Sequence, residues 1–380
     1  MKIAILAAFP IHLLPGFENH GPSGHYATWL PQLARNFETL MASSDEIHWI
    51  VMVKGLKAPV EVSHCGQSFH LLPRFKMSLA ITTYFWAERR KIAKLLHQIE
   101  PDLVHGWGSE DVYGPAQADW KGASILSMQG ILSHYWGITG GNFLERLLAF
   151  YEPITIRRSE HVTSESPWGR NLVREIAPAV EIDLVEYGAS NQFFEIVREL
   201  DPEPTFLCVG SLCYRKGIDI LAKAFADPRL SHCRLKVLGD GPMRGELEAC
   251  GDNVELLGRV GPEKVKELLG SCWALIHPTR ADTSPNSVKE ARVAGMAIIT
   301  TQHGGQAQYV EDGESGYFFE VEDPDSLVGA ILEVAENSEK ALSLGLNQNE
   351  EYRELLSPMK TAVSFMDLYR KRIGSMDENR

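Results

Sequence analysis

Residues 277–295, HPTRADTSPNSVKEARVAG, combine a helix start with groups that could hold an anion. Ser284 is typical of a helix N-cap, and Pro285 of the first helical position, where its missing N–H costs nothing. Such a start leaves free backbone N–H groups at the positive end of the helix dipole, which suits phosphate. The N–H groups expected there are those of Asn286, Ser287 and Val288.

Two carboxylates border this helix start, because Asp282 lies just before the turn and Glu290 lies in the second turn. Beside a phosphate site, carboxylates are poor phosphate ligands, but they accept hydrogen bonds from the hydroxyls of a sugar or ribose. The pattern predicts a site for a sugar that carries phosphate. An ordinary capped helix with a solvated Glu290 is the alternative that this segment leaves open.

A second stretch, residues 205–225, runs from a strand through a short loop into a helix. Arg215 and Lys216 stand in that loop, and adjacent cations at a strand-to-helix crossing can neutralise a diphosphate. A solvated surface pair is the alternative.

A third loop, GPSG at 21–24, would let the backbone approach a ligand closely through its glycines. It is not GxGxxG, so the dinucleotide fingerprint is absent.

The order and spacing of longer segments resemble the family 4 glycosyltransferases. In the C-terminal half the resemblance is carried by VGSLCYRKGIDILAKAF, KVLGDGPMRGELEA, NVELLGRVGPEKVKELL, DTSPNSVKEARVAG and HGGQAQYVEDGESGYFFEVEDPDSL. In the N-terminal half it is carried by GPSGHYATWLPQLA, PDLVHGWGSE, SEHVTSESPWGRNLV and VEYGASNQFF. The likeness covers roughly residues 1–335 and is most specific in the C-terminal half.

The resemblance implies a GT-B fold and sugar transfer from a nucleotide-diphosphate donor with retention of anomeric configuration. Asp282 and Glu290 match the two ends of the family's E-x7-E motif. Glu290 would then bind the ribose hydroxyls, while Asp282 and the backbone amides of 283–287 would hold the transferred sugar. Lys216 matches the family's diphosphate lysine. The other implied donor contacts are a glycine loop that closes over the donor and a backbone segment that reads the nucleobase: Gly24, and Arg259 with Val260.

The sequence departs from the family pattern at four positions. Asp282 replaces the usual Glu and has a shorter reach. Ser211 stands where many members have a phosphate-binding Arg, so we expect Arg215 to supply the second cation. Gln129 stands where many have an active-site His, and Gln308 replaces a common Glu. Because Gln cannot carry a proton, the role of that His cannot be transferred to Gln129, and the family's usual sugar is not to be assumed.

Other candidate sites carry weaker patterns. His105 and Trp107 end a strand and could face the acceptor together with Gln129, or could simply pack inside the domain. Residues 323–325, DPD, fit the DxD pattern of metal-dependent transferases, but they precede a helix and are interpreted as its cap. We expect no metal and no cofactor, because fixed cations would neutralise the leaving diphosphate.

A basic amphipathic stretch could touch an anionic membrane that carries a lipid-linked acceptor, and a solvated helix face is the alternative. Its members are Phe85, Trp86, Arg89, Arg90, Lys91 and Lys94.

Composition excludes several protein classes. The chain of 380 residues is 44% hydrophobic and has 37 Lys+Arg against 50 Asp+Glu, a formal charge of −13. This excludes whole-chain disorder and disfavours nucleic-acid binding.

The six cysteines lack zinc-site spacing and are expected as buried thiols in a reducing cytosol. The start is interpreted as a buried strand rather than a signal peptide. We expect a cytoplasmic protein that could contact the inner face of a membrane.

Short apolar runs alternate with helical patterns, which indicates parallel sheets covered on both faces. The expected strands lie at 2–9, 47–53, 102–107, 124–130, 205–211, 234–240, 253–258, 274–279 and 297–301. The α/β pattern restarts after a polar linker at 198–204. We therefore predict two Rossmann-like doubly wound domains facing a cleft, an acceptor-side domain at 1–197 and a nucleotide-sugar domain at 205–355. By resemblance, residues 356–380 form a helix that packs back on the first domain.

The expected function is that of a retaining hexosyltransferase of cell-envelope polysaccharide biosynthesis. Its donor would be a UDP- or GDP-sugar, and its acceptor a glycan, a lipid-linked group or a small molecule. Two alternatives remain open: a sugar-nucleotide 2-epimerase of the same fold, and a catalytically weak nucleotide-sugar-binding protein. An epimerase would make a new sugar nucleotide from the donor alone.

Overall fold

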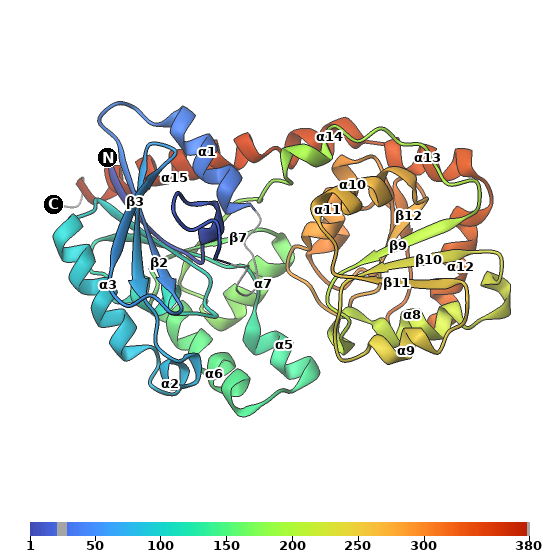
Figure 1. Cartoon of the computed structure of the whole chain (residues 1–380), viewed down its shortest axis with the longest axis horizontal. Helices are drawn as coiled ribbons and strands as arrows, with labels where there is room; N and C mark the ends of the chain where they lie inside the picture. The colour runs from blue at the N-terminus through green and yellow to red at the C-terminus, as the bar shows by residue number, and fades with distance from the viewer. Residues whose placement is uncertain (21–28, 378–380) are drawn as a thin grey trace. The chain divides into compact units, whose positions relative to one another are not determined.

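The computed structural model of the chain describes residues 1–20 and 29–377 (Figure 1). It confirms the predicted α/β class, with strands and helices alternating along the chain. The chain forms two compact units: unit 1 is Met1–Tyr187 with Pro358–Arg380, and unit 2 is Gly188–Ser357. Each unit is built on one sheet.

The sheet of unit 1 has eight strands in the order β3-β4-β2-β1-β5-β6-β7-β8. All neighbouring strands are parallel except the edge pair β3 and β4. The strands are β1 (Lys2–Leu6), β2 (Glu46–Val53), β3 (Val60–His64), β4 (Gln67–Pro73), β5 (Leu103–Trp107), β6 (Ala123–Ser127), β7 (His161–Ser164) and β8 (Glu181–Leu184). Central strands such as β1, β5 and β6 are almost fully buried because helices cover both faces.

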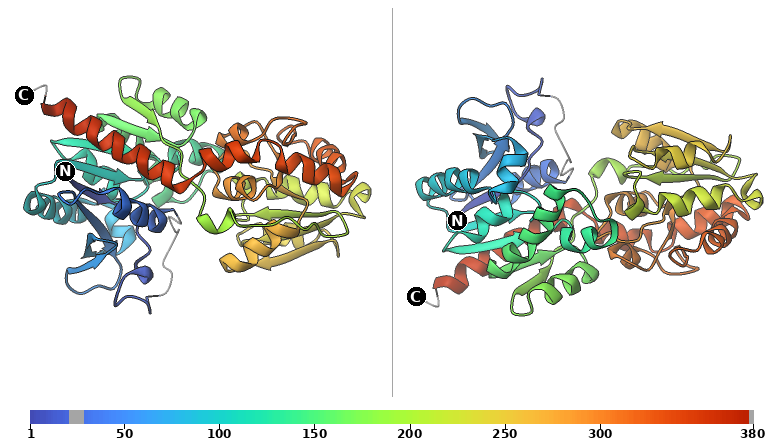
Figure 2. Two further views of the ribbon diagram at one scale, coloured as in Figure 1. Left: turned by 90° about the horizontal axis from the view of Figure 1, so that it is seen from above. Right: turned by 90° about the horizontal axis from the view of Figure 1, so that it is seen from below.

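The helices of unit 1 include one from the far end of the chain, α15 (Pro358–Asp377). The others are α1 (Leu30–Leu40), α2 (Met77–Thr82), α3 (Trp86–Ile99), α4 (Tyr113–Ala118), α5 (Leu132–Thr139), α6 (Phe143–Arg158) and α7 (Pro167–Ile176). Helix α15 packs against α1, β5 and β6 (Figure 2). It places Phe365 and Tyr369 in the same apolar core as strands β1 and β2.

The sheet of unit 2 has six parallel strands in the order β11-β10-β9-β12-β13-β14. They are β9 (Thr205–Val209), β10 (Arg234–Leu238), β11 (Val254–Gly258), β12 (Ala274–His277), β13 (Ala297–Thr300) and β14 (Gly316–Phe318). The helices are α8 (Ile218–Phe225), α9 (Arg244–Glu248), α10 (Pro262–Ser271), α11 (Asn286–Val293), α12 (Pro324–Ala335), α13 (Ser338–Leu346) and α14 (Asn349–Leu355). Counted along the unit, this is the 3-2-1-4-5-6 order of a Rossmann sheet, whose direction switches between β9 and β12.

The segment expected as a linker, residues 198–204, is attached to unit 2. Arg198 Nη2 donates to the carbonyl oxygen of Cys272 at 2.6 Å, and the N–H of Glu199 donates to that of Gly270 at 3.0 Å. The unit boundary therefore lies at 187/188, before the expected end of the first domain at 197. The polar residues of 198–204 made this segment resemble a free linker, although its backbone bonds to the end of α10.

Two features of the whole chain complete the description. Across residues 1–20 and 29–377, no helix has both the length and the apolar character needed to cross a membrane. The six cysteines all lie in the described part and are free; Cys208, Cys233 and Cys272 are buried.

Candidate functional site

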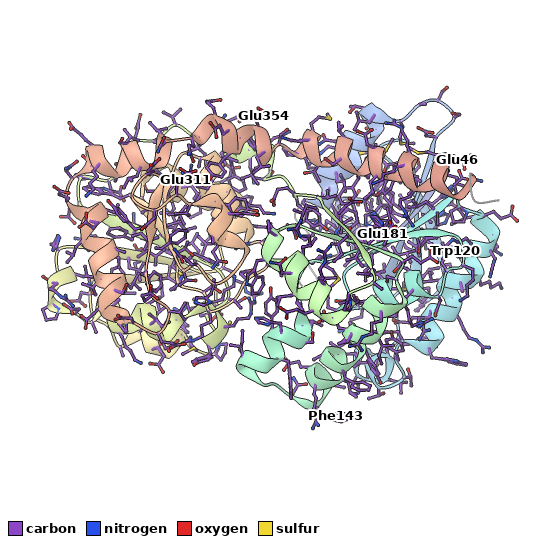
Figure 3. All side chains as sticks on the ribbon, turned by 180° about the vertical axis from the view of Figure 1, so that it is seen from behind. Glu46, Trp120, Phe143, Glu181, Glu311 and Glu354 are labelled. Atoms are coloured by element: carbon purple, nitrogen blue, oxygen red, sulfur yellow. The ribbon has the colours of Figure 1, made fainter. Side chains whose placement is uncertain are left out.

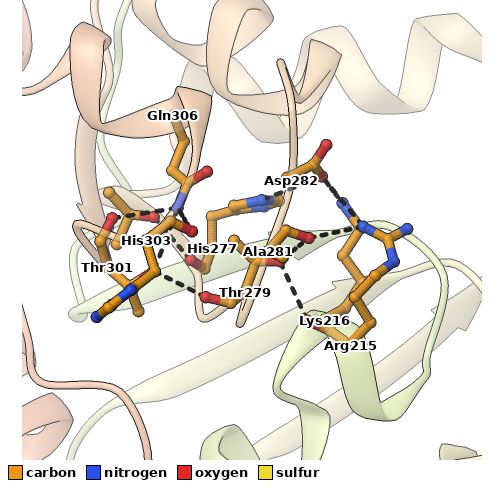
Figure 4. A network of polar contacts seen from close by, with 10 residues as sticks. Arg215, Lys216, His277, Thr279, Ala281, Asp282, Thr301, His303 and Gln306 are labelled. Carbon is orange, nitrogen blue, oxygen red and sulfur yellow. Dashed lines mark hydrogen bonds and ion pairs between the residues drawn. The ribbon is translucent and has the colours of Figure 1, made fainter. Parts of the chain in front are cut away.

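The loops that follow β9 and β12 meet at the switch point of the unit 2 sheet, where ligands bind in doubly wound folds. Lys216, in the short 3₁₀ turn before α8, forms an ion pair with Asp282 in the loop before α11 (Figure 4). Arg215 Nη1 lies 3.9 Å and His277 Nε2 lies 3.6 Å from the same carboxylate oxygen. Three nitrogen-bearing side chains thus surround one acidic group.

The close approach of the two loops depends on Gly217. Its φ is +68°, and a Cβ at this position would lie 1.8 Å from the carbonyl oxygen of Pro278. Only glycine fits there, because the left-handed backbone and the missing side chain are both required. The loops are joined further where Arg215 Nη1 donates to the carbonyl oxygen of Ala281 at 2.8 Å and the N–H of Arg280 donates to that of Arg215 at 2.8 Å.

Arg280 fastens the Asp282 loop to the elements around it. Its guanidinium makes two bonds of 2.8 Å to the carboxylate of Asp219 on α8 and pairs with Glu322 before α12. It also lies over the ring of Tyr214, with 3.6 Å between Cζ and the ring centroid. A nearly buried arginine with two carboxylates is fixed by several charge-assisted hydrogen bonds. Arg280 therefore positions the site without being part of the group around Asp282.

The opposite side of the Asp282 loop is held by residues 301–306. The N–H of Gly305 donates to the carbonyl oxygen of Asp282 at 2.8 Å. Gln306 is fully buried, and its Nε2 donates to the carbonyl oxygens of Thr301 at 3.1 Å and His303 at 3.0 Å (Figure 4). Asp282 is thus restrained through its backbone as well as through its carboxylate.

The charges of the site follow from this crowding. Burial acts to raise the pKa of Asp282, but Lys216, with help from His277 and Arg215, holds that pKa well below its usual range. Burial, followed by the charge of Lys216, lowers the pKa of His277 to about 4. At neutral pH the site therefore holds an ionised Asp282 and a neutral His277 between two cations.

Helix α11 begins differently from the predicted start. Its N-cap is Pro285 and makes no side-chain capping bond, whereas the hydroxyl of Ser284 bonds to that of Tyr309 at 3.0 Å. The N–H of Val288 is not free, because it donates to the carbonyl oxygen of Pro285 at 3.1 Å. The prediction of Ser284 as N-cap and of a free Val288 N–H was therefore wrong. In the described part of the chain, no backbone carbonyl accepts from the two preceding N–H groups, those of Asn286 and Ser287.

Glu290 lies one turn into α11 and is half-buried. Within the described residues, no side chain bonds or pairs with its carboxylate. Burial raises the pKa of this carboxyl to about 8, against a lowering contribution from Lys289. An unpaired, partly dehydrated carboxyl is typical of a group that awaits a ligand, although burial in a helix face alone produces the same shift.

The other residues predicted to contact the donor follow strand ends of the same sheet. Ser211 follows β9 and is exposed, Arg259 follows β11 and is exposed, and Val260 packs partly against the apolar core. Because parallel strands share one carboxyl edge, these residues lie along the edge that holds Lys216. Gly24 lies outside the described residues.

The expected acceptor side is not supported for two of its three residues. His105 and Trp107 are 0% and 1% exposed, and their rings stack on each other with centroids 4.3 Å apart. His105 Nδ1 bonds to the hydroxyl of Tyr369 on α15 at 2.7 Å. Their strand-end position suggested an open site, but α15 covers it, so both are core residues. Gln129, after β6, is half-buried.

Sequence reasoning missed three residues of the site: His277, Arg280 and Gln306. His277 is the last residue of β12 and could have been expected at the carboxyl edge. The role of Arg280 depends on Asp219 and Glu322, which are distant in sequence. No local pattern identifies Gln306 as the residue that fixes the Asp282 loop.

Comparison with known proteins agrees with this geometry. Residues 203–337 match the family Glycosyl transferases group 1. The matched segment lies within unit 2. It contains Arg215, Lys216, Asp282 and Glu290.

Two curated relatives have glycosyltransferase names. An uncharacterized glycosyltransferase of Methanocaldococcus jannaschii is 29% identical over 168 residues, 43% of this chain and 47% of that protein. The lipopolysaccharide core biosynthesis glycosyltransferase LpsE of Rhizobium meliloti is 26% identical over 258 residues, 65% of this chain and 70% of that protein. The first relatives are matched over half of their own length or less, from 37% to 48%.

Solved structures share the fold of both units. Sucrose-phosphate synthase of Thermosynechococcus elongatus has a TM-score of 0.81 at 16% identity, over 99% of this chain and 100% of that chain. HepE of Anabaena in complex with UDP-glucose has a TM-score of 0.69 at 14% identity, over 98% and 100%. The fold of the chain is that of the GT-B glycosyltransferases.

Proposed function

We propose that the protein is a glycosyltransferase that takes a sugar from a nucleotide-diphosphate donor. The observation that carries the proposal is the group of Lys216, Arg215 and Asp282 at the Rossmann switch point, within the segment matched by the group 1 family. Two cations beside a restrained carboxylate suit a ligand with a diphosphate and sugar hydroxyls. The relatives named for lipopolysaccharide and O-antigen synthesis favour an acceptor of the cell envelope.

In the proposed reaction, the bond between the anomeric carbon and the β-phosphate oxygen breaks and negative charge develops on the diphosphate. Lys216 and Arg215 would stabilise that charge, as would the N–H groups of Asn286 and Ser287 at the start of α11. These fixed groups would do so without a metal. The acceptor hydroxyl would attack the anomeric carbon on the face from which the nucleotide leaves and pass its proton to the departing diphosphate, so the sugar would keep its anomeric configuration.

The ion pair between Lys216 and Asp282 gives the donor site a specific starting state. Lys216 and Asp282 are paired with each other before a ligand binds. When Lys216 turns to the diphosphate, Asp282 loses its main counter-charge and becomes free to accept hydrogen bonds from sugar hydroxyls. Binding of the diphosphate and of the sugar would then be coupled through one exchange of partners.

A ligand screen tests the proposal. Thermal unfolding of the wild-type protein is followed with UDP, GDP and their hexose conjugates, since a ligand that binds the native state raises Tm with its concentration. We expect one nucleotide to stabilise, and its sugar conjugate to stabilise further. Stabilisation by no nucleotide would contradict the proposal.

Product analysis then separates the two alternative functions. The stabilising donor is incubated alone, and its products are identified by mass spectrometry and NMR. A new sugar nucleotide would indicate a 2-epimerase. Tight binding without transfer or hydrolysis under any acceptor condition would indicate a binding protein.

A further inference from the structure

Unit 1 exposes large apolar side chains on three adjoining segments: the end of β4 with α2, the start of α3, and α6. Leu79 is 60% exposed, Trp86 57%, Phe143 66% and Phe150 65%. Phe75 and Met77, at 42% and 41%, belong to the same segments. We call these six residues the α2–α6 surface. A cluster of this kind on a folded unit indicates an interaction site.

Packing of the helices brings together the segments that carry these residues. Helix α2 packs against both α3 and α6, and α6 lies beside α2 in Figure 1. The ring of Tyr84, in the turn between α2 and α3, lies 4.4 Å from that of Tyr151 on α6, and the ring of Phe150 lies 5.8 Å from Tyr151. Phe143, labelled in Figure 3, is the first residue of α6.

The turn between α2 and α3 determines which aromatic residue is exposed. Tyr84 and Phe85 have φ values of +49° and +56°, a left-handed backbone that is unfavourable for aromatic residues. In this conformation Phe85 is 1% exposed in the core, while the next residue, Trp86, stands in solvent. The fold thus maintains an unfavourable turn that buries Phe85 and leaves Trp86 on the surface.

The charge of the surface is opposite to that of the whole chain. Over residues 75–94 and 143–150 the exposed ionisable side chains are four cations and one carboxylate: Lys76, Arg90, Lys94, Arg146 and Glu145. Glu88, the other carboxylate there, is 1% exposed. The chain as a whole has a formal charge of −13. This positive, apolar surface therefore stands on a negatively charged protein.

The structure corrects the membrane contact expected from sequence. Phe85 is buried, Arg89 makes bonds of 2.7 and 2.6 Å to Asp119, and Lys91 Nζ donates to the carbonyl oxygen of Pro73 at 2.9 Å. Of the predicted stretch, Trp86, Arg90 and Lys94 remain available. Arg90 lies over the ring of Trp86, with Cζ 4.5 Å from its centroid. The other apolar members come from α2 and α6, which no motif marked.

We propose that the α2–α6 surface binds an anionic lipid bilayer, with its apolar side chains in the interface and its cations on the headgroups. Aromatic and aliphatic side chains flanked by Lys and Arg suit the boundary between headgroups and acyl chains. A second copy of this surface would bring like charges together, whereas an anionic bilayer complements both its charge and its hydrophobicity. The inference goes beyond the proposed function, because it uses no residue of the donor site.

Sedimentation of the full chain with lipid vesicles tests the proposal. We expect the protein to bind mixed phosphatidylcholine–phosphatidylglycerol vesicles, to bind pure phosphatidylcholine vesicles much more weakly, and to dissociate as salt is raised. The double variant R90E/K94E should lose roughly 20-fold or more in affinity, since each cation near an anionic surface contributes about fivefold. The double variant L79S/F150S should lose at least about tenfold, because it removes apolar area from the interface.

Matched controls come from unit 2. Leu346 on α13 is 52% exposed and Lys223 on α8 is exposed, so L346S and K223E should bind vesicles as the wild type does. The substituted residues are all exposed, so far-UV circular dichroism and Tm should stay unchanged. Equal binding to neutral and anionic vesicles, no binding, or full binding by L79S/F150S would overturn the proposal.

Two further readouts complete the test. Sedimentation velocity without lipid detects self-association; a wild-type dimer that the α2–α6 variants dissolve would assign the surface to a second copy and overturn the proposal. The nucleotide thermal shift should be the same in all these variants. Because vesicle binding and nucleotide stabilisation are measured separately, failure of this proposal is distinguishable from failure of the proposed donor site.

Discussion

The carboxyl ends of the central strands are used differently in the two units, although both sheets are doubly wound. In unit 2, Lys216 and Asp282 stand at the strand ends with side chains that remain 16% and 12% exposed. In unit 1, His105 bonds through Nε2 to the hydroxyl of Ser127 at 2.6 Å, and Ser127 bonds to the hydroxyl of Thr163 at 2.5 Å, all of them buried. One edge holds a pair of opposite charges that keeps a small exposed area, and the other holds a buried chain of neutral hydrogen bonds.

A position at the carboxyl end of a strand does not by itself make a ligand-binding site. Helix α15 covers the strand ends of β5 and β6, and burial, with a smaller contribution from His161, lowers the pKa of His105 to about 3. A histidine that stays neutral throughout the physiological range serves as a hydrogen-bonding core residue. At the edge in unit 2, two loops bring Lys216 and Asp282 together as an ion pair.

Phe365→Ala should have the largest effect on stability and should act on unit 1 alone. Phe365 is fully buried, and its ring lies 5.1 Å from those of both His105 and Trp107. We expect a loss of about 3–5 kcal/mol in the free energy of unfolding, measured in urea, because a large aromatic side chain leaves a cavity. The Kd for the stabilising nucleotide should not change. Val363→Ala, at a 40% exposed position of the same helix, is the control.

If Phe365→Ala instead weakened nucleotide binding and left the free energy of unfolding unchanged, the assignment of His105 and Trp107 to the core of unit 1 would be wrong.

Lys216→Ala should have a large effect on activity, and it should also lower stability, because Asp282 keeps, among the described residues, only Arg215 as a nearby cation. We expect transfer to slow by about 10²–10³, or about 2.7–4 kcal/mol, which is the usual cost of removing one preorganised charge-stabilising group. Initial rates at saturating donor measure this. The control is Lys223→Ala in the following helix, where the side chain is exposed. Wild-type turnover in Lys216→Ala would remove Lys216 from the donor site.

Glu290→Gln should show the smallest effect on stability, and that effect should appear only as a dependence on pH. The pKa of Glu290 is raised from 4.5 to about 8 by burial, so the folded state holds this proton more tightly than the unfolded state does. Stability from this group is fully present below pH 4.5 and is lost as the pH rises through about 8. We expect the wild type to lose about 1 kcal/mol relative to Glu290→Gln over this range, since a half-buried carboxyl keeps part of its hydration.

Urea unfolding of both proteins at a series of pH values gives this difference directly. A constant difference between the two curves would show that the carboxyl titrates normally. The same variant should weaken nucleotide binding in calorimetry, and an unchanged Kd would contradict a contact between Glu290 and the ligand.

Sequence patterns were sufficient for the fold class because the central strands of both sheets are short, strongly apolar runs between turn residues. KIAIL and ALIH, which form β1 and β12, are examples. Strands β3, β4, β7, β8 and β14 were not predicted. The edge strand β3, VEVSH, shows why: its alternating residues carry little hydrophobic contrast. The start of α11 was predicted one residue too early. The hydroxyl of Ser284 bonds to that of Tyr309, and this tertiary hydrogen bond replaces a capping bond to the helix.

The candidate site was predictable where neighbours in sequence are neighbours in space. Arg215 with Lys216, and Asp282 with the start of α11, are of this kind. For His105 and Trp107 the sequence could not decide between an acceptor site and core packing, because the helix that buries them lies more than 250 residues later in the chain, as the 264-residue separation of His105 and Tyr369 illustrates. When a distant element buries a residue, the local sequence pattern does not indicate that burial.

That same helix has a consequence for how the protein is made. Residues 1–187 leave the ribosome first, but their core is closed by Phe365 and Tyr369, which are translated after all of unit 2. The first unit to emerge is thus the last to be completed, and the surface that α15 will cover, around β5 and β6, stays uncovered while unit 2 is synthesised. Transiently exposed apolar surface of this kind makes a folding intermediate prone to aggregation.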